Sequence, residues 1–390
     1  MKKLNAILRG NLRQYVMVIA LAVVIILFQI MTGGVLLKPL NISNLISQNS
    51  YVFILATGML LCILTCGNVD LSVGSVAGFI GAISAVFILK MNMPVLPAIL
   101  ISLAVGVIIG VWQGFWIAYV GVPAFIATLA GMLIFRGLTM VILQSTSLAP
   151  MPSGYTFIAA GFIPDIVNIP GINLLAVIAG IGSSALYIFG EIRNRLSKKK
   201  YNFEVSSTGA FLAKLIGITL VINAFTYSLA LYKGIPAVLI IVALLVLVYT
   251  FITNKTIPGR HIYAYGGNPK AAKLSGVKTK QVLFWVYVNM GFLAALAGII
   301  FTGRLNSATP KSGNGFEMDA IASCFIGGAS TSGGIGTVVG AIVGALLMGV
   351  LNNGMSIMGV SIDWQQAIKG FVLLAAVAFD VYSKSKSRTV

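Results

Sequence analysis

Long apolar runs alternate with short polar interruptions from one end of the 390-residue chain to the other. About 20 helical residues cross a hydrocarbon core of about 30 Å, and several of the runs reach that length. Backbone polar groups inside lipid must be bonded within their own segment, so each run is expected to be a helix. The pattern therefore predicts an all-α, polytopic membrane protein with a single transmembrane domain over residues 1–390.

Run lengths and the Pro and Gly residues that interrupt them predict about twelve transmembrane helices. The predicted spans are 16–37, 51–66, 71–89, 95–119, 124–143, 172–190, 210–231, 234–253, 283–303, 314–329, 334–352 and 364–383. Lysine and arginine precede the first span and follow the last one. Because basic residues favour the cytoplasmic side, both termini are predicted to be cytoplasmic, which an even number of spans allows.

Charge in the connecting segments follows the same alternation. Segments 191–208 and 254–282 are rich in lysine and arginine, and both are predicted to be cytoplasmic loops. Segment 144–171 is poor in charge and punctuated by Pro and Gly, and it is predicted to be an external loop where a partner could dock. Segment 38–50 is predicted to lie on the same external side.

Composition supports the membrane class and excludes several others. Hydrophobic residues make up 58% of the chain and charged residues 9%, against roughly 25% charged in soluble domains. The 26 Lys and Arg that give a net charge of +18 lie in short segments between apolar runs, which indicates contact with an anionic leaflet rather than with nucleic acid. The lipid bilayer is thus the first expected partner.

Signatures of catalysis and of metal binding are absent from the sequence. There is one histidine, no CxxC pair and no GK dipeptide, so neither a multi-histidine metal site nor a Walker A loop can form. Cys62, Cys66 and Cys324 lie in or beside apolar runs and are interpreted as small apolar fillers. We expect a non-enzymatic chain without a metal or cofactor of its own; any ATP and Mg²⁺ would be bound by another subunit.

Two interruptions resemble one another: CGNVDLSVGSVAGFIGA at 66–82 and GGASTSGGIGTVVGAIVGA at 327–345. Each places a polar, glycine-rich break directly before a helix, and we predict broken helices at 66–71 and 327–334. Paired breaks in two halves are typical of a transporter pathway. Glycines at small-xxx-small spacing also allow close helix packing without any pathway role, and both readings remain open.

Charged residues within the apolar spans are few and expensive to bury. Asp70 and Asp319 either cap helix starts or serve the pathway, and the sequence does not decide between these roles. Arg136 is the one basic residue well inside a span, and its partner is either a carboxylate or a set of helix-end carbonyls. We treat Arg136 and Asp319 as structural intramembrane charges.

The stretch GGNPKAAKLSG at 266–276 is unusually polar for this chain. Asn268 suits the N-cap of a short helix, Pro269 its first turn and Gly276 its end. About two helical turns over 269–275 would then lie outside the membrane. Such a helix is either a docking surface for a protein or part of a solvated linker drawn to anionic lipid.

Five blocks of sequence resemble the permease subunits of bacterial ATP-binding cassette importers of the ribose, xylose, galactose and multiple-monosaccharide group. They are HIYAYGGNPKAAKLSGV at 261–277, GNVDLSVGSVAG at 67–78, FIATLAGMLIFRGLTMVI at 125–142, AALAGIIFTGRLNSATP at 294–310, and the block from Met318 to Val360. The resemblance implies a permease domain in the bacterial inner membrane. It further implies a second permease copy, a cytoplasmic ATPase and an external sugar-binding protein as partners.

The same resemblance assigns roles to individual positions. Residues expected to couple the chain to the ATPase are Gly267, Asn268, Pro269, Ala272, Leu274, Ser275 and Gly276. Residues expected to line or gate the translocation path are Asn68, Asp70, Leu71, Ser72, Gly74, Gly327, Gly328, Ser330 and Gly334. The pore itself is expected to hold no strong sugar site.

The region 172–253 departs from the shorter ribose-type permeases, because it holds three apolar runs rather than one. A ten-helix core with an inserted pair resembles the longer permeases and favours xylose or a mixed set of monosaccharides as substrate. Another polar solute, such as a nucleoside, a signalling sugar or a branched-chain amino acid, is the alternative. An ion-coupled secondary transporter is the competing mechanism.

Overall fold

The computed structural model describes residues 2–165, 167–203, 205 and 207–388. Almost all regular structure there is helical, apart from one antiparallel pair of two-residue strands, β1 (Asn168–Ile169) and β2 (Ile172–Asn173). The predicted all-α class is confirmed. The helices are α1 (Lys2–Met31), α2 (Pro39–Leu64), α3 (Val73–Ala85), α4 (Val95–Phe115), α5 (Ala124–Leu143), α6 (Ser153–Ala160), α7 (Leu174–Lys200), α8 (Thr208–Ala230), α9 (Ala237–Lys255), α10 (Ile257–Gly267), α11 (Pro269–Leu274), α12 (Thr279–Leu305), α13 (Phe316–Ile326), α14 (Val338–Ile357) and α15 (Ile362–Arg388).

Nine helical segments in the described part of the chain are long and apolar enough to cross a membrane, fewer than the twelve predicted spans. Two of them combine α3 and α4 with the π-helical turns that continue them, Val86–Lys90 and Trp116–Val120. The other three predicted spans fall on α1, α13 and α15. Helix α13 has only 11 residues. In α1 the described side chains form an apolar stretch at Met17–Met31, and the rest of the predicted spans 16–37 and 364–383 falls partly on side chains outside the described residues.

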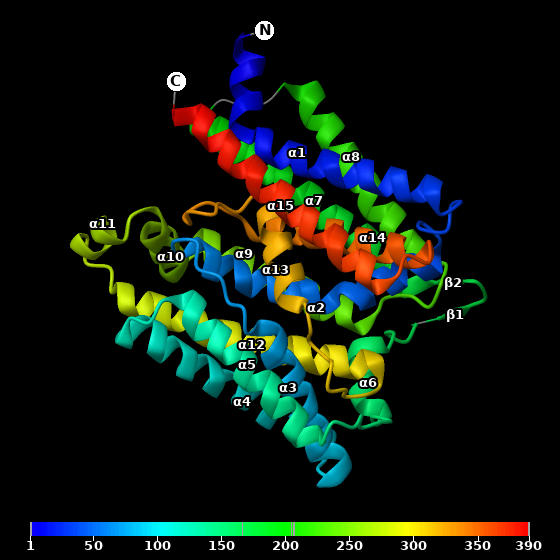
Figure 1. The fold of residues 1–390 in the computed structure, drawn as a ribbon. Helices are drawn as coiled ribbons and strands as arrows, with labels where there is room; N and C mark the ends of the chain where they lie inside the picture. Colours follow the sequence, from blue (N-terminus) through cyan, green and yellow to red (C-terminus); the bar gives the residue numbers. More distant parts are fainter. Residues whose placement is uncertain (1, 166, 204, 206, 389–390) are drawn as a thin grey trace.

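Helix α12 is the centre of the bundle and packs against α4, α2 and α3. Its 27 residues make it about 40 Å long at about 1.5 Å per residue. Figure 1 shows it running from the edge of the molecule that holds α10 and α11 toward the opposite edge, where α6 and the β1–β2 hairpin lie. The predicted cytoplasmic loop 254–282 and the predicted external loop 144–171 are therefore at opposite ends of the bundle.

Several predicted boundaries change. Helix α2 begins at Pro39, because a proline in the first turn starts the helix early, so most of the predicted external segment 38–50 is helical. Helix α7 continues to Lys200, so the first part of the predicted basic loop 191–208 is helical as well. Positions 204 and 206 of that loop, and position 166 of loop 144–171, lie outside the described residues.

The pair α7 and α8 forms a hairpin at the periphery of the bundle (Figure 1). These helices pack mainly against each other, and α8 also touches α2. None of the most apolar window of α8 is buried, as expected for a helix that faces lipid. The hairpin therefore lies outside the central packing of the bundle.

Both predicted helix breaks are present. Helix α2 ends at Leu64 and α3 begins at Val73; α13 ends at Ile326 and α14 begins at Val338. Glycines with positive φ angles, among them Gly67, Gly328 and Gly334, form the two intervening loops. The breaks bring irregular backbone inside the protein, where neighbouring segments satisfy it.

Candidate functional site

The short helix α11 has the ends that the sequence predicts. The side chain of Asn268 accepts a hydrogen bond from the backbone N–H of Ala271 at 3.1 Å, and Pro269 occupies the first turn. At the other end Gly276 has a φ of +87°, and Val277 donates its N–H to the carbonyl of Ala272 at 3.0 Å. Local capping thus holds six residues helical without a membrane around them.

The side chains of α11 differ widely in exposure. Ala272 is 5% exposed and packs inside the loop, whereas Leu274 is 90% exposed. A Cβ added at Gly267 would meet nothing within 4 Å. A partner approaching this loop would therefore meet Leu274 and the backbone at Gly267, while Ala272 supports the loop from behind.

Helix α10, which precedes α11, was missed at the sequence level. Thr256 caps it by accepting a hydrogen bond from Gly259 at 3.4 Å, and Pro258 lies in its first turn. Thr-x-Pro is a start signal that could have revealed this helix. Tyr263 of α10 donates its hydroxyl to the carbonyl of Gly336 at 2.7 Å, and burial raises the pKa of this phenol, so the donor stays protonated at neutral pH.

Helix α10 also contacts the first break. The thiol of Cys66 donates to the carbonyl of Tyr265 at 3.3 Å. A Cβ on Gly266 would overlap the carbonyl oxygen of Leu64 and would lie 2.6 Å from the nitrogen of Gly334. Only glycine fits at position 266, because three backbone segments meet there.

The two breaks contact one another. Gly334 donates its N–H to the carbonyl of Leu64 at 3.0 Å, and a Cβ on Gly333 would lie 2.5 Å from the nitrogen of Cys66. The tertiary structure thus joins the two glycine-rich segments with α10 into one junction. We call this the break junction, formed by residues 64–67, 263–266 and 333–336.

Asp70 forms a buried polar cluster beside the junction. Its carboxylate accepts hydrogen bonds from the N–H of Ser72 at 2.9 Å and from the hydroxyl of Ser72 at 2.6 Å. Gln113 of α4 donates to the same hydroxyl at 2.6 Å. The N-cap residue of α3 is Ser72 rather than Asp70, so Asp70 holds the turn that leads into α3.

The other predicted path residues occupy packing or turn positions. Asn68 donates to the carbonyl of Thr65 at 2.7 Å, and Ser330 shares a hydrogen bond with Ser332 at 2.8 Å. A Cβ on Gly74 would overlap Gly313, one on Gly327 would overlap Gly340, and one on Gly328 would lie 3.1 Å from the sulfur of Met17. Leu71 is partly buried. The close-packing reading accounts for these contacts.

The intramembrane charges have identifiable partners. Arg136 donates to the side-chain oxygen of Asn314 at 3.0 Å. Asp319 forms an ion pair of 2.9 Å with Lys369 of α15 and accepts a hydrogen bond from the hydroxyl of Tyr51 at 3.1 Å. The N-cap of α13 is Gly315, so Asp319 is not the cap. Its partner Lys369 lies within the predicted span 364–383 and was not singled out from the sequence.

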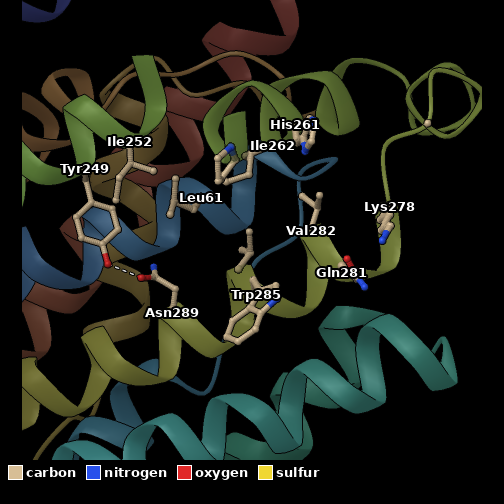
Figure 2. A pocket seen from close by; sticks show the side chains of 13 residues that line it. Leu61, Tyr249, Ile252, His261, Ile262, Lys278, Gln281, Val282, Trp285 and Asn289 are labelled. Atoms are coloured by element: carbon tan, nitrogen blue, oxygen red, sulfur yellow. Dashed lines mark hydrogen bonds between the residues drawn. The ribbon is translucent and has the colours of Figure 1, made fainter. Parts of the chain in front are cut away.

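A cavity of about 470 Å³ lies beneath the loop that carries α11, between α9, α10 and α12. Figure 2 shows Tyr249 and Asn289 hydrogen-bonded to each other at its deep end, while Lys278 and Gln281 lie at the end next to the loop. Its walls are mostly apolar. In the described part of the chain no group of three His, Cys, Asp or Glu residues could hold a metal ion.

Comparison with known proteins shows what the chain is similar to. A family model described as "branched-chain amino acid transport system / permease component" matches residues 41–377. The xylose transport system permease protein of Haemophilus influenzae is 38% identical over 376 residues, which cover 96% of this chain and 98% of that protein. The corresponding Escherichia coli K12 protein is 35% identical over 377 residues, covering 97% and 94%.

The ribose import permease protein of Escherichia coli K12 is 35% identical over a shorter stretch of 340 residues, which covers 87% of this chain and 85% of that protein. No solved structure matches the chain. The family model covers most of the sequence, two breaks join beside an exposed capped helix, and nine segments within the described ranges suit a membrane. This multi-pass membrane protein therefore belongs to the family of branched-chain amino acid transport system permease components.

Proposed function

We propose that this chain is the membrane-spanning subunit of a bacterial inner-membrane importer that moves a monosaccharide, xylose or a mixed set of pentoses and hexoses. The nearly full-length similarity to permeases named for xylose supports the sugar class. The peripheral hairpin α7–α8, within the region longer than the ribose type, supports xylose over ribose. The chain itself is non-catalytic, and the ATP and Mg²⁺ belong to a partner ATPase.

One observation carries the proposal: α11 and α10 are continuous with the break junction. Leu274 is exposed on α11 for a partner, and Gly266 at the end of α10 is wedged against Leu64 and Gly334. Force applied to the loop from the cytoplasm would reach the ends of α2 and α13–α14 within a few residues. Rigid contacts of this kind allow a remote ATPase to shift transmembrane helices.

The coupling role falls on Gly267, Asn268, Pro269, Leu274, Ser275 and Gly276, with Ala272 as support. Asn68, Asp70, Leu71, Ser72, Gly74, Gly327, Gly328, Ser330 and Gly334 act through the break junction and its surroundings, gating the path by moving helices. A second copy of the chain completes the pore, and an external binding protein delivers the sugar to the face that holds α6 and β1–β2.

The competing ion-coupled mechanism finds little support. Such a transporter needs carboxylates arranged around an ion or a proton path. Asp70 instead bonds Ser72, and Asp319 bonds Lys369 and Tyr51. The alternative of another polar solute stays open to test, because the family description names branched-chain amino acids.

Reconstitution in proteoliposomes tests the proposal. The chain is combined with an ATPase and a sugar-binding protein of the same organism's importer, and uptake of radiolabelled D-xylose, D-ribose and L-leucine is measured. We expect xylose uptake that requires ATP and both partners. Uptake by the chain alone under a sodium or proton gradient would overturn the importer mechanism, and ATP-driven uptake of leucine but not of xylose would overturn the substrate class.

A further inference from the structure

A second cavity, of about 500 Å³, lies at the end of the bundle opposite α11, between α2, α12, α14 and α15. Phe301 and Arg304 line it from the last turns of α12, about 35 Å along that helix from its start beside α11. The cavity is thus remote from the break junction. It lies toward the face that the proposed function assigns to the binding protein.

The lining of this cavity is unusual for a protein so rich in apolar residues. Most of its residues are amides, hydroxyls or cations, and Tyr51 and Phe301 contribute aromatic rings. The two rings meet edge to face with centroids 5.5 Å apart. Polar side chains at membrane depth are costly and are retained where they face water or a polar ligand.

Internal pairing accounts for part of this polarity. Asn41 and Asn353 exchange two amide hydrogen bonds, of 2.8 and 3.1 Å, which fix one wall of the cavity. Lys369 is neutralised by Asp319 at 2.9 Å. These groups shape the cavity, and their hydrogen-bonding capacity is largely used within the protein.

Two lining groups have hydrogen-bonding or charge capacity that the described residues do not use. The buried side-chain oxygen of Asn352 has no hydrogen-bond partner among the described residues, although a buried amide oxygen is normally bonded. No carboxylate in the described ranges forms an ion pair with Arg304, whose guanidinium carries five N–H donors. Donors and an acceptor beside aromatic rings suit a neutral polyol, whose hydroxyls both donate and accept and whose ring carbons pack on aromatic faces.

We propose that this cavity is a monosaccharide-binding station at the outer end of the translocation path, with Asn352 and Arg304 bonding the sugar hydroxyls and Tyr51 and Phe301 forming its apolar wall. The inference rests on the proposed function and differs from the expectation of a pore without a strong sugar site. The substrate path begins here, whereas the break junction serves the coupling movement. Its volume lies in the range of small-molecule sites.

The test uses the assembled transporter with Asn352→Cys, modified from outside by a membrane-impermeant thiol reagent, with and without D-xylose and without ATP. We expect millimolar xylose to slow modification several-fold, while L-leucine does not. Wild-type chain reports the background from its own cysteines. Stronger protection by the anion D-xylonate than by xylose would overturn the neutral-sugar assignment, because it would indicate an anion site at Arg304.

Transport gives a second readout. Loss of one hydrogen bond to the sugar is worth about 1 kcal/mol, so Asn352→Leu should lower xylose uptake by about 5- to 10-fold. Asn223→Leu on the peripheral helix α8 is the matched control and should keep wild-type uptake. This inference is overturned if uptake by Asn352→Leu is normal and xylose does not protect the Asn352→Cys variant from modification. ATP-driven uptake by the wild-type chain would then still support the proposed function. Absence of uptake by the wild-type chain would overturn the proposed function instead.

Discussion

The carbonyl oxygen of Leu64, the last residue of α2, accepts a hydrogen bond from the N–H of Gly334 at 3.0 Å. This bond joins the two glycine-rich breaks, which lie in opposite halves of the sequence. Gly266 packs against both partners of the bond. The end of α10 therefore touches the point where the two halves of the bundle meet.

Gly266→Ala should destabilise the protein, because the new methyl group overlaps the Leu64 carbonyl and crowds Gly334. Overpacking of this kind costs about 1–3 kcal/mol. The expected result is a lower Tm in detergent and reduced uptake. Gly267→Ala is the matched control, since its methyl group meets nothing within 4 Å; equal Tm values for the two variants would contradict the junction.

Leu274→Asp should weaken binding of the ATPase without changing the fold, because Leu274 is 90% exposed on α11. Burying a leucine in a partner's cleft contributes about 2 kcal/mol, which corresponds to roughly 30-fold in Kd. Affinity of the purified chain for the ATPase, measured by biolayer interferometry, checks this. Lys273→Ala on the same helix should have a much smaller effect, and tight binding by Leu274→Asp would rule out α11 as the docking helix.

Gly267→Trp should fold normally yet uncouple ATP hydrolysis from uptake, because position 267 is open on the surface and a large ring there would block a docking cleft. Uptake and ATPase rates are measured on the same proteoliposomes. Ala272→Trp, in contrast, should lower Tm, because Ala272 is 5% exposed inside the loop. Coupled transport at the wild-type rate by Gly267→Trp would count against the loop as the contact.

Asp70→Asn should retain uptake, because the side-chain oxygen of Asn can accept both hydrogen bonds from Ser72. Asp70→Leu should lower stability by about 1–3 kcal/mol, since it leaves the buried hydroxyl and N–H of Ser72 without an acceptor. Uptake assays and thermal unfolding of both variants check this. Complete loss of uptake in a stable Asp70→Asn protein would indicate a carboxylate with a proton or ion function.

Lys369→Met should destabilise the protein by about 3 kcal/mol, because it leaves the buried Asp319 carboxylate without its cation. The double variant Asp319→Asn/Lys369→Met should recover most of this loss, since no buried charge then remains unpaired. Thermal unfolding of the two single variants and the double variant forms a cycle that measures the coupling. Additive effects would show that the ion pair does not stabilise the bundle.

Local patterns predicted the long apolar helices, the capped turn at 268–276 and the two breaks, because capping residues and apolar runs are properties of neighbouring positions; the short helices α6 and α10 were missed. Boundaries were less predictable. The start of α2 at Pro39 lies in a moderately polar stretch. The predicted span 314–329 is an apolar run of ordinary length, but its helix α13 has only 11 residues.

The sequence by itself determined the all-α membrane class, the family and the exposed short helix, because length, hydropathy and capping are local properties of the chain. Only the tertiary structure decided that Gly266 rather than Gly267 is the tight contact, that Lys369 neutralises Asp319, and that polar residues from four helices surround one cavity. Each of these depends on which distant segments pack together, and no local pattern encodes the distance between residues on different helices.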